Sequence, residues 1–169
     1  GDFVSTIAGT TEHPVIVQPY QNERVIIDGS LAINGAYTHW YDIEKRYSGG
    51  TRYTEDTGSS PAIEAGILAV NGEGTKLINW LVYDQVTNGI AWWAASKGSE
   101  LYGCVIFNNG WLAPDRGHGH SVYTQNAPAN AVKTMRHCIL GPSFGSANDS
   151  TNLACFTSGG EGLQHFDFL

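Results

Sequence analysis

The sequence predicts an all-β fold: a right-handed parallel β-helix, a solenoid of about five coils, forming one domain over residues 1–169. Three observations predict it: a repeated apolar frame, a second short unit that alternates with this frame, and punctuation of both by Gly and Asn. Helices should be minor, because no segment longer than about ten residues keeps a helical apolar period. A β-sandwich is the alternative, but it does not require register-matched repeats.

The apolar frame recurs at an offset of 24 residues, between KLINWLVYDQ at 76–85 and ELYGCVIFNN at 100–109. It also fits TMRHCILGPS from Thr134 and, more loosely, GLQHFDFL from Gly162. Because side chains alternate along a strand, the frame predicts which residues face the interior of the solenoid. The predicted inward residues are Leu77, Trp80, Val82, Leu101, Cys104, Ile106, Met135, Cys138 and Leu140.

The second unit consists of a small residue, an aliphatic residue, a spacer and another small or apolar residue. It is found at 30–33, 66–69, 89–92, 121–124 and 152–155. Its alignment predicts a second sheet, on which the residues after each unit face outward and stack on one another. These predicted outward residues are Val70, Trp93, Gln125 and Phe156.

The distance between the two units varies along the chain. It is 8 residues from Val82 to Ile90, 24 from Ile43 to Ile67, 16 from Ile106 to Val122 and 13 from Leu140 to Leu153. In a solenoid, insertions at one connection emerge along one edge. We therefore expect the loops around 48–61, 110–119 and 141–151 to cluster in space, and we look for function there.

Four segments carry a family resemblance: TEHPVIVQPYQNERVIIDGSLAING from Thr11, TKLINWLVYD from Thr75, ELYGCVIFNNGW from Glu100 and RGHGHSVYTQN from Arg116. They resemble the pectate-lyase-like right-handed β-helix repeat proteins, in particular secreted bacterial ones of poorly defined function. The resemblance covers roughly Thr11 to Leu140. It implies an extracellular, carbohydrate-directed module. Whether such a module also cleaves the polysaccharide is left open.

The second insertion and its strand concentrate the residue types that such chemistry needs: Asp115, Arg116, His118, His120 and Tyr123. Cleavage of uronic-acid polysaccharides by elimination requires a base for the proton beside the carboxylate, and a cation that neutralises the resulting negative charge. One of the two histidines or the tyrosine would be the base, and the arginine would neutralise the carboxylate.

Two tryptophans, Trp93 and Trp111, are candidates for carbohydrate binding, because indole faces pack against the C–H faces of sugar rings.

A purely structural interpretation of the same cluster stays open. Asp115 and Arg116 could pin a loop, the histidines could bond to backbone, and Tyr123 could be an ordinary outward strand residue. His118 and His120 with Asp115 could alternatively bind a metal, although two histidines and one acid make a weak motif. No phosphate loop, dinucleotide fingerprint or metal-spaced cysteine set indicates a cofactor, and a calcium ion is left open.

Three cysteines cannot all pair internally. Cys104 and Cys138 are predicted to stack on adjacent coils, where strands lie ~4.8 Å apart, a separation that a disulfide tolerates. Two buried thiols filling a core layer are the alternative, and Cys155 is unpaired in both cases. Asn148 begins the only glycosylation sequon.

Composition limits the partners. The formal net charge is −7, so no basic stripe is available to neutralise phosphates, and nucleic acid is disfavoured. The longest apolar run, residues 89–95, is far shorter than the ~20 residues that span a bilayer. The low charged fraction and 21 glycines favour an extracellular or cell-surface all-β protein, without a membrane span.

Aligned apolar residues on the outside of the predicted coils suggest a second function. Leu81, Val105 and Ile139 form one outward row, and Tyr83 and Phe107 form another. Aligned outward apolar residues indicate a covered face or an interface, so self-assembly into a filament or surface layer is the alternative to carbohydrate binding. The long insertions could instead cover these rows.

Overall fold

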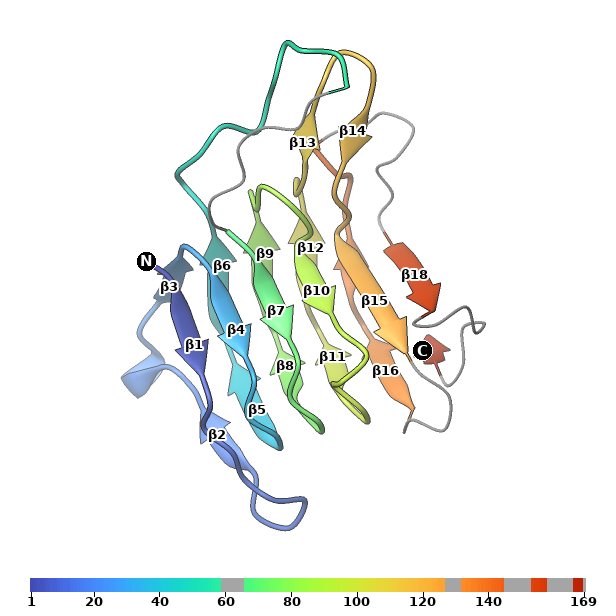
Figure 1. The fold of residues 1–169 in the computed structure, drawn as a ribbon. Helices are drawn as coiled ribbons and strands as arrows, with labels where there is room; N and C mark the ends of the chain where they lie inside the picture. Colours follow the sequence, from blue (N-terminus) through green and yellow to red (C-terminus); the bar gives the residue numbers. More distant parts are fainter. Residues whose placement is uncertain (59–65, 127–131, 145–152, 158–165, 169) are drawn as a thin grey trace.

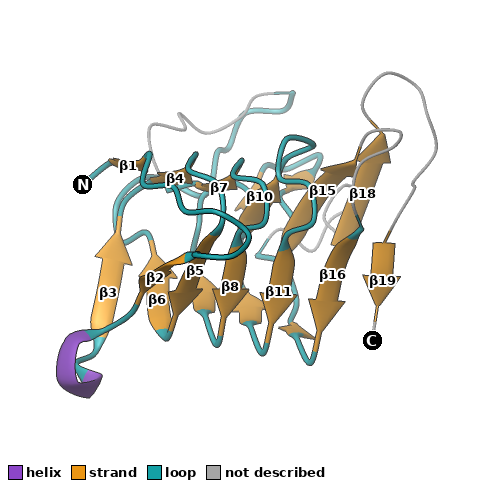
Figure 2. Cartoon of the chain, turned by 90° about the horizontal axis from the view of Figure 1, so that it is seen from below, coloured by secondary structure: helices purple, strands orange, loops and turns teal. Residues whose placement is uncertain are grey.

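A computed structural model describes residues 1–58, 66–126, 132–144, 153–157 and 166–168, and it is a parallel β-helix, as the repeat predicts (Figure 1). Three parallel sheets run along the solenoid, and we label them A, B and C. A short 3-10 helix, η1 (Tyr20–Asn22), lies at the N-terminal end of the solenoid (Figure 2). Within the described residues, no helix has the length and apolar character that crossing a bilayer requires.

The three sheets are built from strands of two to five residues. Sheet A contains β1 (Phe3–Ser5), β4 (Leu31–Ile33), β7 (Leu68–Val70), β10 (Ile90–Trp92), β15 (Val122–Asn126) and β18 (Leu153–Thr157). Sheet B contains β2 (Val15–Val17), β5 (Thr38–Tyr41), β8 (Lys76–Ile78), β11 (Glu100–Tyr102), β16 (Lys133–Arg136) and β19 (Phe166–Phe168). Sheet C contains β3 (Val25–Asp28), β6 (Ile43–Arg46), β9 (Leu81–Tyr83), β12 (Val105–Phe107) and β17 (Ile139–Leu140).

Each coil takes one strand from each sheet in the order A, B, C. The described strands form five complete coils, and β18 and β19 begin a sixth. The prediction of about five coils is therefore confirmed. Outside the three sheets, β13 (Trp111–Leu112) and β14 (Gly117–His118) pair antiparallel as a small hairpin.

The interior of the solenoid is the hydrophobic core, and it confirms the inward positions that the apolar frame predicts. Leu77 pairs with Leu101, and Leu101 with Met135, so these side chains stack from coil to coil. Most of the predicted inward residues are buried, and Cys138 and Leu140 are partly buried against the same cluster. Alternation within short strands is what separates this apolar interior from the outer faces.

The predicted register of the second unit is wrong by one residue in coil 3. Val70 pairs with Trp92 and is buried in the core, so it does not stack with Trp93 on the outside. The reason is that the run from Ile67 to Val70 contains aliphatic or small residues at every position. A one-residue slip in such a run exchanges the inner and outer faces of the strand. The predicted pairing of Gln125 with Phe156 is confirmed.

Single residues in the left-handed backbone conformation make the corner between sheets B and C. Asp42, Asn79, Gly103 and His137 follow successive sheet B strands, with φ between 53° and 66°. Asn, Asp and Gly enter this conformation most readily, which explains why they punctuate the repeat. The side-chain amide of Asn79 donates a hydrogen bond to the Asp42 carboxylate at 3.3 Å, which links neighbouring corners.

The three long insertions all leave sheet C and return to sheet A, and their described parts cluster at one edge of the solenoid, as predicted (Figure 1). We call this the loop edge; its described parts are residues 47–58, 108–121 and 141–144. Tyr53 of the first insertion forms an isolated parallel bridge with Leu112 of the second. Segments about 60 residues apart in sequence therefore lie side by side.

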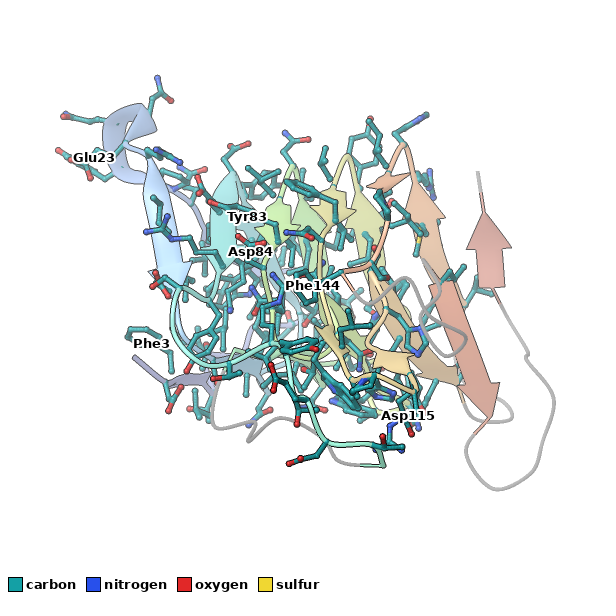
Figure 3. The ribbon with its side chains drawn as sticks, turned by 90° about the horizontal axis from the view of Figure 1, so that it is seen from above. Phe3, Glu23, Tyr83, Asp84, Asp115 and Phe144 are labelled. Atoms are coloured by element: carbon teal, nitrogen blue, oxygen red, sulfur yellow. The ribbon has the colours of Figure 1, made fainter. Side chains whose placement is uncertain are left out.

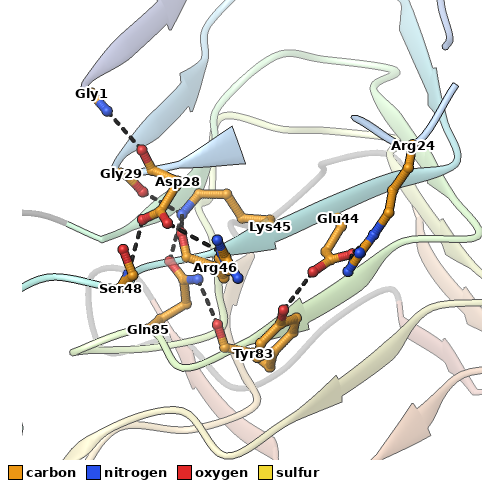
Figure 4. Close-up of polar contacts among 10 residues, drawn as sticks. All are labelled: Gly1, Arg24, Asp28, Gly29, Glu44, Lys45, Arg46, Ser48, Tyr83 and Gln85. Atoms are coloured by element: carbon orange, nitrogen blue, oxygen red, sulfur yellow. Dashed lines mark hydrogen bonds and ion pairs between the residues drawn. The ribbon is translucent and has the colours of Figure 1, made fainter. Parts of the chain in front are cut away.

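A buried lysine fastens the corner between sheets C and A at the N-terminal end of the solenoid. Lys45 on β6 is fully buried, and its ammonium donates to the carbonyl oxygens of Gly29 and Arg46 and to Oε1 of Gln85 (Figure 4). Burial lowers the pKa of Lys45 to about 8. A lysine inside the solenoid was not predicted from the repeat.

Candidate functional site

Five ring side chains and one guanidinium form a continuous row that runs from the β13–β14 hairpin onto the outside of sheet A. We call it the ring row; its members, in order, are Arg116, Trp111, His118, His120, Tyr123 and Trp93. Successive ring centroids are 5.5, 5.9, 6.0 and 5.6 Å apart, starting from Trp111. The structure therefore brings together all the predicted catalytic and carbohydrate-binding residues except Asp115.

The hairpin places the first rings of the row. Trp111 on β13 lies opposite His118 on β14, so their side chains are neighbours on the same face. Gly110 and Gly119 enclose the hairpin with φ of 107° and 102°. A Cβ on Gly119 would lie 2.4 Å from the Cα of Gly110, so this close crossing of two backbones requires glycine.

Backbone hydrogen bonds fix His120 and Tyr123 to the neighbouring coil. The His120 amide donates to the side-chain oxygen of Asn88 at 3.1 Å, and its carbonyl accepts from the Gly89 amide at 2.8 Å. Tyr123 is the outward residue of β15 and pairs with Ala91 of β10. The middle of the ring row is thus attached to the regular part of the solenoid.

Exposure differs along the ring row. Trp111 is 3% exposed and His120 is 8% exposed, whereas His118 is exposed and Tyr123 and Trp93 are half-buried. The ring of Trp111 is therefore covered in this structure and supports its neighbours, and its buried Nε1 has no hydrogen-bond partner within the described residues. The accessible part of the row consists of Arg116, His118, Tyr123 and Trp93.

Asp115 and Arg116 hold the second insertion against the first. The amide of Gly58 donates to Oδ2 of Asp115 at 3.0 Å, and Nη2 of Arg116 donates to the carbonyl of Gly58 at 3.0 Å. Figure 3 shows Asp115 on the outer side of these loops. Pinning a loop is the structural role that the sequence left open for both residues. Arg116 also remains next to the row, with its Cζ 5.5 Å from the Trp111 ring centre.

Arg52 joins the three insertions and was missed from the sequence. Its guanidinium donates to the carbonyls of Asn108 and Gly110, and to the Asp84 carboxylate at 3.0 Å. It also lies over the ring of Phe144 in the third insertion. Burial lowers the pKa of Arg52, because the charged form loses water. No motif distinguishes this arginine from an exposed one.

Lys133, at the start of β16, is a second fully buried lysine that the sequence analysis did not single out. Its Nζ lies 2.7 Å from the Trp93 carbonyl, 2.7 Å from the Gln125 carbonyl and 3.2 Å from the Trp92 carbonyl. Burial lowers its pKa to about 7. The contact with Trp93 links this residue to the outer end of the ring row.

The predicted cysteine stack is present away from the ring row. Cys104 and Cys138 precede the paired residues Val105 and Ile139 on adjacent coils, and both are free thiols in this structure. A hydrogen bond between the two side chains raises the pKa of Cys104 and lowers the pKa of Cys138, and burial raises the Cys104 pKa further. The disulfide between them stays a prediction.

Two other predicted features have no structural test here. Asn148 lies outside the described residues. Within the part of the chain that the structure describes, no three His, Cys, Asp or Glu side chains converge on a position for a metal ion.

Comparisons with protein-family models, with curated proteins and with solved structures find no match to this chain. The fold and the ring row therefore carry the functional argument.

Proposed function

We propose that this chain is an extracellular carbohydrate-directed β-helix module, and that the ring row is its binding site. The observation that carries the proposal is the row itself: Trp93 and Tyr123 present half-buried ring faces on a rigid sheet, and His118 extends them as an exposed imidazole. Aromatic faces contact the C–H faces of sugars, while ring nitrogens and hydroxyls bond to sugar hydroxyls. The resemblance to pectate-lyase-like repeat proteins supports the same function.

Cleavage by elimination is the catalytic extension of this proposal. His118 is the candidate base, because it is exposed, whereas His120 is buried between its neighbours. The base would take the proton from the carbon beside the uronate carboxylate, and a C=C bond would form to the neighbouring carbon as its bond to the leaving oxygen breaks. That oxygen would take up a proton from water. Arg116, at the end of the row, would neutralise the carboxylate.

Binding and cleavage are tested on a panel of polygalacturonate, alginate, hyaluronan, xylan and cellulose. Affinity electrophoresis measures binding, and the ultraviolet absorbance of new unsaturated ends measures cleavage. We expect W93A to weaken binding by about tenfold, and H118A to abolish any cleavage while weakening binding less than W93A does. Binding without cleavage would reduce the function to recognition, and silence in both assays across the panel would contradict the proposal.

A second candidate function is self-assembly, and the outer face of sheet C favours it. Leu81, Val105 and Ile139 pair in one outward row, and Ile139 is 64% exposed. Next to this row, the rings of Tyr83 and Phe107 stack at 5.5 Å. The first coil adds exposed Phe3, Val4 and Ile16. Sedimentation at increasing protein concentration tests this role, and a strictly monomeric particle at high concentration would contradict it.

A further inference from the structure

Lys133 occupies a register position that holds a hydroxyl in coils 2 to 4 and Val15 in coil 1. The pairing of sheet B places Thr38, Thr75, Ser99 and Lys133 above one another at the corner between sheets A and B. In coils 2 and 3 the hydroxyls of Thr38 and Thr75 contact each other at 3.4 Å, and in coil 4 Ser99 accepts a bond from Trp92 Nε1 at 2.6 Å. Coil 5 replaces this small group with a buried cation.

The ammonium of Lys133 is matched to its surroundings. An ammonium has three N–H donors, and three carbonyl oxygens, of Trp92, Trp93 and Gln125, lie within hydrogen-bond distance of Nζ. The Trp92 ring centre lies 4.9 Å away, which adds a cation–π contact. Placing a charge here is costly unless it is fully bonded, so these contacts offset the loss of water.

The carbonyls that Lys133 contacts come from two coils, and each of these coils carries one aromatic residue at the outer end of the ring row. Trp93 is a member of the row in coil 4, and its carbonyl also accepts from Ser96 Oγ at 2.6 Å. Gln125 lies in coil 5, and its Nε2 donates to the hydroxyl of Tyr123 at 3.2 Å. One buried cation therefore joins the backbones that carry the two accessible aromatic rings.

We propose that Lys133 is a positioning residue that fixes Trp93 and Tyr123 relative to each other for ligand contact. The inference rests on the proposed function, because it assigns how that site is preorganised. A hydroxyl at this position is too short to reach the carbonyls of both coils. Hydrogen bonds from a cation are also stronger than neutral ones, so they hold the two strands more firmly. Preorganisation of this kind lowers the cost of binding.

Lys45 provides a matched control. It is equally buried, and it also donates to two backbone carbonyls and one further oxygen (Figure 4). It lies in coil 2, and its partners Gly29, Arg46 and Gln85 are not members of the ring row. K45M and K133M therefore each remove a buried, hydrogen-bonded ammonium from the interior. Only Lys133 contacts a residue of the ring row.

Two readouts test the proposal, both taken at pH 6, where Lys133, with a pKa of about 7, is mostly charged. The first is the indole N–H resonance of Trp93 in the free protein, assigned with W93F; the second is affinity for polygalacturonate. We expect K133M to shift and broaden the Trp93 resonance and to weaken polygalacturonate binding by about tenfold. We expect K45M to leave both within about twofold of the wild type, although both variants lose stability.

Each other outcome is decisive. An unchanged Trp93 resonance in K133M, or equal changes in K45M, would overturn the positioning role. If the wild type does not bind any polysaccharide, the proposed function fails while the resonance still decides the role of Lys133. If K133M does not fold, K133Q replaces it, because its neutral amide keeps two donors; the same direction of change is then expected, at smaller size.

Discussion

The guanidinium of Arg52 lies 4.1 Å from the ring centre of Phe144, so the first insertion of the solenoid is packed against the third. The same guanidinium donates to the carbonyl of Gly110, at the entrance to the hairpin of the second insertion. One side chain of the first insertion thus contacts the other two insertions of the loop edge. The guanidinium of Arg52 therefore holds the loop edge together. Because it bonds to Gly110, it also fixes the hairpin that carries Trp111 and His118 of the ring row.

Replacing Arg52 should destabilise the loop edge as a unit. R52A removes the donors of two backbone carbonyls and the partner of Asp84. We expect a loss of about 2–4 kcal/mol in unfolding free energy, measured by urea denaturation, because partly buried groups lose their partners. R46A is the control: its ion pair with Asp28 is partly exposed and screened by solvent, so its loss should cost much less stability than R52A. Equal losses in both variants would contradict the role of Arg52.

The close crossing at Gly119 predicts a second effect. G119A places a Cβ against the backbone of Gly110 at a positive φ, so we expect a loss of about 2–4 kcal/mol and disorder of the His118 and Trp111 rings. Near-ultraviolet circular dichroism would detect the loss of ordered rings. Gly58 also has a positive φ, but a Cβ there meets nothing within 4 Å, so G58A should cost only about 1 kcal/mol.

The two stacked thiols should differ in reactivity. Cys138 is half-buried and its pKa is lowered by the hydrogen bond from Cys104, whereas Cys104 is fully buried with a raised pKa. Iodoacetamide should therefore modify Cys138 before Cys104 in the native protein, as peptide mass mapping would show. C104A removes the hydrogen bond, so the pH at which Cys138 reacts at half its maximal rate should rise. Faster labelling of Cys104 would disprove the assignment.

The buried lysines predict that stability rises with pH. Burial lowers the pKa of Lys133 to about 7 and of Lys45 to about 8, below the 10.5 of an exposed lysine. At a pH between the native pKa of each lysine and 10.5, the unfolded chain binds a proton at that lysine, whereas the native chain has released it. The free energy of unfolding should therefore increase by up to roughly 1.4 kcal/mol per lysine for each pH unit in that window.

This pH dependence can be measured by urea denaturation at pH 6.5 and 9, and the double variant K45M/K133M should flatten it. A slope in the double variant as steep as in the wild type would show that other groups cause it.

The repeat made the solenoid, its inward residues and the loop edge predictable, because stacking forces equivalent residues of successive coils onto one another. It placed Cys104 beside Cys138 correctly for this reason. It misplaced Val70, because a run of aliphatic and small residues does not define which face is inward.

The ring row was only partly predictable. The rings from His118 to Tyr123 are close in sequence, so their proximity follows from a short hairpin and a strand. Asp115 is adjacent to Arg116 in sequence, yet its carboxylate bonds to the first insertion, which no local pattern reveals. Lys133 was missed because a lysine in a strand is normally assigned to the solvent face, and its partners are carbonyls, which every residue has.

The contacts of Arg52 also constrain how this edge can vary. Apart from Asp84, its partners lie in the second and third insertions, so a change in the length of one loop moves the surface against which the others pack. The sequences and lengths of the three insertions can therefore change only in a coordinated way, while the coils beneath them stay regular. Grafting one of them alone onto another solenoid should leave a buried arginine or its carbonyl partners without hydrogen bonds.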